Sequence, residues 1–88
     1  MANRRSLKQT INLICEELFS ECVAASLYST NQDGGKALLF GVVRMQDDFI
    51  RRVSHPEPGM PAKKYFKQLR NDFVVQVDHI IDHINNLA

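Results

Sequence analysis

The chain has 88 residues, 44% of them hydrophobic and 24% charged, with few glycines and prolines. This composition predicts one globular domain over residues 1–88 and excludes collagen-like, disordered and disulfide-rich proteins. Eleven Lys and Arg stand against ten Asp and Glu, so an anion-binding or nucleic-acid-binding site would have to come from the local arrangement of charges.

The first predicted helix runs from about Ser6, its expected N-cap, to Tyr28. Its apolar residues recur at steps of three and four: Leu7, Ile11, Ile14, Leu18, Cys22 and Ala25. Cys15 and Cys22 would lie about 10 Å apart on one helix, beyond the reach of a disulfide. We expect both to be small buried thiols in a reducing, cytoplasmic compartment. No apolar run is long enough to span a membrane.

Residues 29–35 collect turn formers and two glycines, so a loop is predicted there before a second helix from about Lys36 to Val53. The apolar face of this second helix is predicted to contain Leu39, Val42, Val43, Phe49, Ile50 and Val53. One alternative stays open, a β-hairpin over residues 22–45 that turns at Asp33-Gly34-Gly35, because the run from Leu38 to Val43 also has strand-like composition.

The segment from His55 to Pro61 contains three prolines and cannot continue a helix, so it is predicted to be a stiff connector. A third helix is predicted from Ala62 to Leu87, and it has the clearest apolar stripe of the chain: Phe66, Leu69, Phe73, Val77, Ile80, Ile84 and Leu87. Three amphipathic helices with short connectors predict an all-α, up-down-up three-helix bundle.

That topology would bring most basic residues to one end of the bundle. Nine of them fall in the three segments that meet there: Arg4, Arg5, Lys8, Arg51, Arg52, Lys63, Lys64, Lys67 and Arg70. Two helix N-termini would point their free amides to the same end, and Tyr65 could stack on a base. The sequence therefore permits an anionic ligand or nucleic acid at this end, although such charge runs are usually only solvated.

Catalytic and metal-binding patterns are not found in the sequence. His79 and His83 share a helix face, but they lack the glutamate of a zinc-protease helix and are predicted to lie on a polar surface. Both thiols are expected to be buried and neutral, and a neutral thiol is a poor nucleophile. The sequence predicts no enzyme, no cofactor and no metal site.

The first predicted helix, which we call helix 1, has more apolar residues than a single core requires. Leu13 and Leu27 point away from its main stripe, Val23 flanks it, and Phe40 lies off the stripe of the second helix. Burial on two sides of helix 1 would explain this surplus. We therefore predict a non-enzymatic protein-interaction module that dimerises through helix 1, using Leu13, Val23, Leu27 and Phe40.

Overall fold

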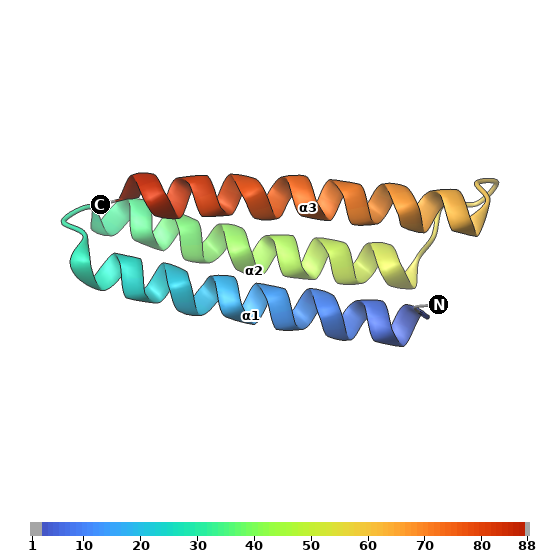
Figure 1. Cartoon of the computed structure of the whole chain (residues 1–88), viewed down its shortest axis with the longest axis horizontal. Helices are drawn as coiled ribbons and strands as arrows, with labels where there is room; N and C mark the ends of the chain where they lie inside the picture. Colours follow the sequence, from blue (N-terminus) through green and yellow to red (C-terminus); the bar gives the residue numbers. More distant parts are fainter. Residues whose placement is uncertain (1–2, 88) are drawn as a thin grey trace.

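A computed structural model describes residues 3–87, so Met1, Ala2 and Ala88 of the predicted 1–88 domain lie outside the described residues. Residues 3–87 form three helices, α1 (Arg4–Tyr28), α2 (Gln32–Ser54) and α3 (Ala62–Leu87), and contain no strand. Each helix runs opposite to the one before it, in a bundle of 47 × 19 × 16 Å (Figure 1). The predicted all-α, up-down-up three-helix bundle is confirmed, and the alternative hairpin over residues 22–45 is wrong.

Both of the first two helices begin earlier than predicted, because an asparagine caps each one. The side chain of Asn3, rather than Ser6, caps α1 by accepting a hydrogen bond from the Ser6 N–H at 2.8 Å. Asn31 caps α2 by accepting one from the Gly34 N–H at 2.9 Å. The predicted loop over residues 29–35 therefore shrinks to residues 29–31, and both glycines lie inside the first turns of α2.

Gly35 has a packing role that explains why glycine is tolerated in this helix. A Cβ atom at this position would lie 2.5 Å from the Ser26 Oγ of α1. The missing side chain lets α2 approach α1 closely at the end where the two helices are joined. Helix propensity alone would place Gly35 in a loop. The close packing of α2 on α1 explains why a glycine stands inside the helix instead.

The core lies where the three helices meet. Its buried apolar residues are Leu7, Ile11, Cys15, Leu18 and Cys22 of α1, Leu38, Val42, Met45, Phe49 and Val53 of α2, and Leu69 and Phe73 of α3. The predicted face of α2 is rotated, because Leu38 and Met45 are buried whereas Val43 is 50% exposed. The core-facing side of α2 is therefore the one with Leu38 and Met45, and Val43 faces outward.

The apolar side chains of α3 are less buried than its sequence pattern predicts. Its bounds match the prediction, but only Leu69 and Phe73 are fully buried, and the rest of its stripe is half-buried. The Ser29 hydroxyl donates to the Leu87 carbonyl oxygen at 2.9 Å and ties the end of α3 to the α1–α2 turn. Helices α1 and α2 pack extensively, whereas α1 and α3 make the fewest contacts of any pair.

Candidate interaction surfaces

The three basic segments do meet at one end of the bundle. Helices α1 and α3 begin there and α2 ends there, at the end of Figure 1 where the chain's N-terminus lies. The Arg4 guanidinium lies 5.8 Å from the centre of the Phe66 ring, so a basic residue of α1 contacts the first turns of α3 directly. We call the nine predicted basic residues at this end the basic end.

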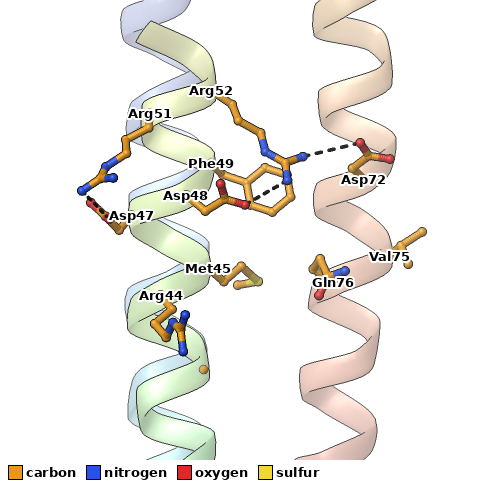
Figure 2. A pocket seen from close by; sticks show the side chains of 11 residues that line it. Arg44, Met45, Asp47, Asp48, Phe49, Arg51, Arg52, Asp72, Val75 and Gln76 are labelled. Carbon is orange, nitrogen blue, oxygen red and sulfur yellow. Dashed lines mark ion pairs between the residues drawn. The ribbon is translucent and has the colours of Figure 1, made fainter. Parts of the chain in front are cut away.

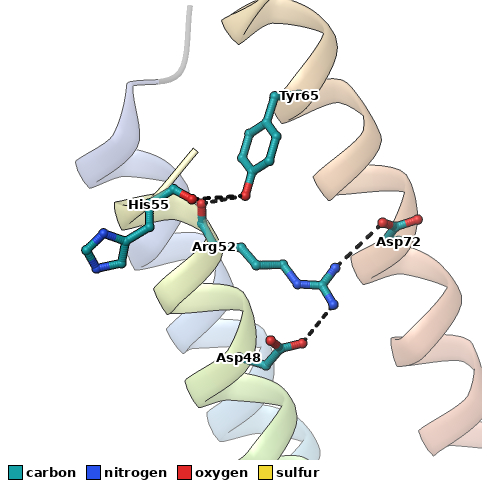
Figure 3. A network of polar contacts seen from close by, with 5 residues as sticks. All are labelled: Asp48, Arg52, His55, Tyr65 and Asp72. Atoms are coloured by element: carbon teal, nitrogen blue, oxygen red, sulfur yellow. Dashed lines mark hydrogen bonds and ion pairs between the residues drawn. The ribbon is translucent and has the colours of Figure 1, made fainter. Parts of the chain in front are cut away.

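Two arginines of the basic end are already paired with carboxylates. Arg51 contacts Asp47 at 3.1 Å. Arg52 contacts Asp48 at 3.0 Å on its own helix and Asp72 of α3 at 3.6 Å (Figure 3). Within residues 3–87 the other seven make no ion pair: Arg4, Arg5, Lys8, Lys63, Lys64, Lys67 and Arg70. The charge available to an anion is therefore smaller than the sequence predicts.

Tyr65 has a structural role that competes with base stacking. Its hydroxyl donates to the Arg52 carbonyl oxygen at 2.9 Å, across the start of the Pro-containing connector (Figure 3). Its ring packs edge-on against Phe66, with centroids 5.3 Å apart, and against the core. The tyrosine thus links the end of α2 to the start of α3, and its ring is half-buried.

A hollow of about 760 Å³ lies between α2 and α3 (Figure 2). Its walls are charged, because Arg44, Asp47 and Asp48 of α2 line it opposite Asp72 and Gln76 of α3. In Figure 2 the guanidinium of Arg52 reaches from α2 across the hollow to Asp72. These carboxylates are exposed and serve as ion-pair partners, which favours a solvated surface over an acid–base centre.

One side of α1, together with α2, forms what we call the α1/α2 face. Its centre is a hydrogen bond in which the Gln46 amide donates to the Asn12 side-chain oxygen at 2.9 Å. Phe19 and Val23 follow Asn12 by seven and eleven residues, near whole numbers of helical turns, so they share its stripe. Both are 39% exposed, and Val43 on the Gln46 side of α2 is 50% exposed. This face is partly apolar and has a polar pair at its centre.

The other side of α1 meets α3 in what we call the α1/α3 face. A hollow of about 560 Å³ opens there over residues of the core, and its rim includes Ile14, Arg70 and Val74. A second hollow of about 480 Å³ continues along the same pair of helices, lined by Glu17, Glu21, Ala24, Ala25 and Tyr28 of α1 and Ile84 of α3. Val74 is 58% exposed and Ile81, two turns further on, is 41% exposed. This face is open, with an apolar centre.

Comparison with known proteins gives no family. No family model, no curated protein and no solved structure matches this chain. What the chain can do must therefore come from its own contacts, burial and charges.

The predicted dimer residues are all exposed and lie on two helices. Leu13, Leu27 and Phe40 are strongly exposed, and Val23 is partly so. Leu13 and Leu27 are fourteen residues apart on α1, which is about 21 Å. Phe40 lies two residues from buried Leu38 and two from buried Val42, so it points to the opposite side of α2. The predicted interface through these four residues therefore stays a prediction. Val74 and Ile81, which extend the apolar stripe of α3 in the sequence, are exposed as well.

The two cysteines are free, buried thiols. Burial raises the pKa of Cys15 to about 11. Burial, and then the charge of Glu21, raise the pKa of Cys22 as well. Both thiols are therefore neutral near pH 7, which is unfavourable for a nucleophile or a metal ligand.

The histidines stay on the surface of α3. Nδ1 of His83 lies 2.9 Å from the His79 carbonyl oxygen, within the same helix. Nowhere in the described part of the chain do three His, Cys, Asp or Glu side chains gather as a metal site would need. Among helices α1 to α3, none has an apolar stretch that could cross a membrane.

Proposed function

We propose that this chain is a non-enzymatic protein-interaction module that acts as a homodimer. The observation behind the proposal is the exposed apolar side chains on the two faces that border α1, Phe19 and Val23 of α1 on one face and Val74 and Ile81 of α3 on the other. Contiguous exposed apolar patches on small proteins usually mark a protein interface. A second folded copy would bury such a face and enlarge a small core.

The total surface area supports the same proposal. The chain exposes 6381 Å² to solvent, whereas a compact monomer of 10.1 kDa is expected to expose about 5,300 Å². A standard interface buries about 800 Å² on each partner. Dimerisation would therefore remove most of this excess. The two buried thiols, free of any disulfide, fit a reducing compartment such as the cytoplasm.

Sedimentation equilibrium from low to high micromolar concentration tests the proposal. We expect a mass close to twice 10.1 kDa at the upper end of that range, with dissociation on dilution. A single 10.1 kDa species at every concentration would contradict the homodimer.

A second candidate function is the binding of an anionic ligand or nucleic acid at the basic end. It is supported by the seven basic side chains there that make no ion pair within residues 3–87. The N-termini of α1 and α3 also point to that end, although Asn3 already accepts from one first-turn N–H of α1. Phosphate contacts of this kind release counterions, so affinity should fall steeply as salt is raised.

Titration of a mixed-sequence oligonucleotide at low salt tests this second function. Neutralising Lys63, Lys64 and Lys67 together, each to Gln, should abolish binding. Lys36 lies at the start of α2, at the other end of the bundle, so K36Q is the matched control and should bind normally. Equal affinity of the two variants would contradict a site at the basic end.

A further inference from the structure

The α1/α3 face has a regular order of side chains along its length. At the basic end Arg70 borders the first hollow. The centre is apolar, with Ile14 and Val74 on the two helices and Val77 packed against the core below. Beyond this centre, from the middle of α1 onward, Glu17 and Glu21 line the second hollow. The face thus runs from basic through apolar to acidic.

The same order is found in each of the two helices that form the face. Helix α1 has Arg4, Arg5 and Lys8 in its first turns and acidic Glu16, Glu17 and Glu21 later. Helix α3 begins with Lys63, Lys64, Lys67 and Arg70, and its second half has Asp78 and Asp82. Because α1 and α3 run in the same direction, their basic ends coincide and their acidic ends coincide (Figure 1).

We propose that a second copy of this chain packs antiparallel on the α1/α3 face, related by a two-fold axis that crosses both helices near Ile14 and Val74. The proposal rests on the homodimer proposed above and adds its face and its direction. An antiparallel copy places the Arg70 end of one protomer over the Glu17 and Glu21 end of the other, twice by symmetry. A parallel copy would place basic end on basic end, which like-charge repulsion opposes.

The arrangement of helices in the proposed dimer also follows from this face. The four helices of the interface, α1 and α3 from each protomer, would form an antiparallel four-helix layer around one apolar centre. Each protomer's exposed Val74 and Ile81 would cover the other's hollow, beneath which Ile11 and Phe73 lie in the core. The interface would extend the existing core, as dimer interfaces of small helical proteins do.

The α1/α2 face is a poorer match for a second copy. Its centre is occupied by the Asn12–Gln46 hydrogen bond, which a partner would have to desolvate. Lys8 lies one turn before Asn12 and Glu16 one turn after it, and Lys36 near the start of α2 follows Asp33 by three residues, so basic and acidic residues alternate along this face. An antiparallel copy would therefore gain no ordered pairing of opposite charges there.

Two neighbouring valines of α3 give a matched test of the face. Val74 borders the α1/α3 hollow, whereas Val75 borders the charged α2/α3 hollow. They are 58% and 50% exposed, so either can be changed to Glu with similar effects on folding, which circular dichroism verifies. We expect V74E to weaken the dimer by at least about tenfold, because two charges enter an apolar interface, and V75E to leave it unchanged. Equal dimerisation of the two variants would overturn the choice of face.

Charge reversal then tests the direction. R70E alone, and E17K with E21K alone, should each weaken the dimer severalfold, because each places like charges in contact across the interface. The combined variant R70E/E17K/E21K exchanges the two ends and should dimerise like the wild type. Failure of the combined variant to recover, with its helix content intact, would overturn the antiparallel arrangement.

The outcomes also separate this inference from the proposed function. A wild-type chain that stays monomeric overturns both. A wild-type dimer that is disrupted by Phe19→Glu but not by Val74→Glu keeps the homodimer and overturns the α1/α3 face. A dimer that loses affinity with V74E and recovers with the combined charge exchange supports the face and the direction together.

Discussion

Helix α1 has two neighbours, and it meets them in different ways. With α2 it packs antiparallel over its whole length, with Gly35 allowing close approach at one end and the Asn12–Gln46 hydrogen bond halfway along. With α3 it packs in parallel and leaves two hollows over the core. The α1–α2 pair therefore supplies most of the fold, while the α1–α3 side is the part of the core that is least covered.

The α1–α2 side stabilises the fold, and the α1–α3 side is available for binding, because the helices are joined and fixed differently. Consecutive antiparallel helices joined by a short turn align easily along their whole length. The third helix is fixed at its start by Tyr65 and the connector, and at its end by the Ser29–Leu87 hydrogen bond. Between those points only Leu69 and Phe73 are deeply buried. The middle of α3 can thus present Val74 and Ile81 to a partner without loss of the fold.

Replacing a fully buried aromatic ring should have the largest effect. Phe49 of α2 is 2% exposed and packs edge-on against Phe73, with ring centroids 5.1 Å apart. Phe49→Ala should lower the free energy of unfolding by about 4 kcal/mol, close to the whole stability of so small a domain. Urea denaturation measures the loss.

Phe40→Ala is the matched control for Phe49→Ala, since both residues lie on α2 and Phe40 is 72% exposed. Its free energy of unfolding should change by less than about 0.5 kcal/mol. Phe40 lies outside the proposed α1/α3 interface, so Phe40→Ala should leave the affinity of the dimer unchanged. A large loss of stability from Phe40→Ala would show that the outer side of α2 is covered after all.

Alkaline pH should weaken the packed side of α1 through Cys15. Burial raises its pKa to about 11 from 9.0. Between those values the unfolded chain has released a proton that the folded chain retains, so stability falls as the pH rises from about 9 to about 11. The loss attributable to Cys15 is on the order of 2 kcal/mol.

Urea denaturation at pH 8 and near pH 10.5, for the wild type and for Cys15→Ala, isolates this loss. All other ionisable groups are present in both proteins, so the difference between the two pH profiles reports the Cys15 thiol. Parallel profiles would show that Cys15 is accessible to water in the folded chain.

Breaking the hydrogen bond between Asn12 and Gln46 should have a smaller effect. Its donor and acceptor are 2.9 Å apart and partly buried, so each side chain can bind water when its partner is removed. A double-mutant cycle of Asn12→Ala and Gln46→Ala should give a coupling energy of about 0.5–1 kcal/mol. Zero coupling, measured by urea denaturation, would mean that the α1/α2 face is held by apolar packing alone.

The sequence pattern was sufficient for the architecture, because periodicity identifies amphipathic helices whatever they pack against. It was insufficient for the rotation of α2. Leu39 and Val43 are as apolar as Leu38 and Met45, so the pattern alone could not show that Leu38 and Met45 are buried more deeply. The same limit applies to Val74, which continues an apolar stripe and yet lies outside the core.

Ion pairs within one helix can be predicted from the sequence more easily than ion pairs between helices. Asp48 and Arg52 are four residues apart on a helix, so their ion pair was predictable from the spacing. The contact of Arg52 with Asp72 joins two helices and depends on how they align. The start of α2 had a local signal too, since Asn31 is a favoured N-cap residue, but the two glycines after it suggested a loop. The closeness of Gly35 to Ser26, which no pattern reveals, explains the glycine.

Removing the ion pair between α2 and α3 should have the smallest effect. Arg52 and Asp72 approach to 3.6 Å, and their side chains are 42% and 49% exposed. Water and salt screen such a pair, so Asp72→Asn should lower the free energy of unfolding by less than about 0.5 kcal/mol. Arg52 also keeps its contact with Asp48, which limits the loss further. Thermal unfolding in low and high salt measures the difference, which should vanish in high salt. A loss above about 1 kcal/mol that survives high salt would show that charge pairing, rather than burial of Leu69 and Phe73, holds α3 on the bundle.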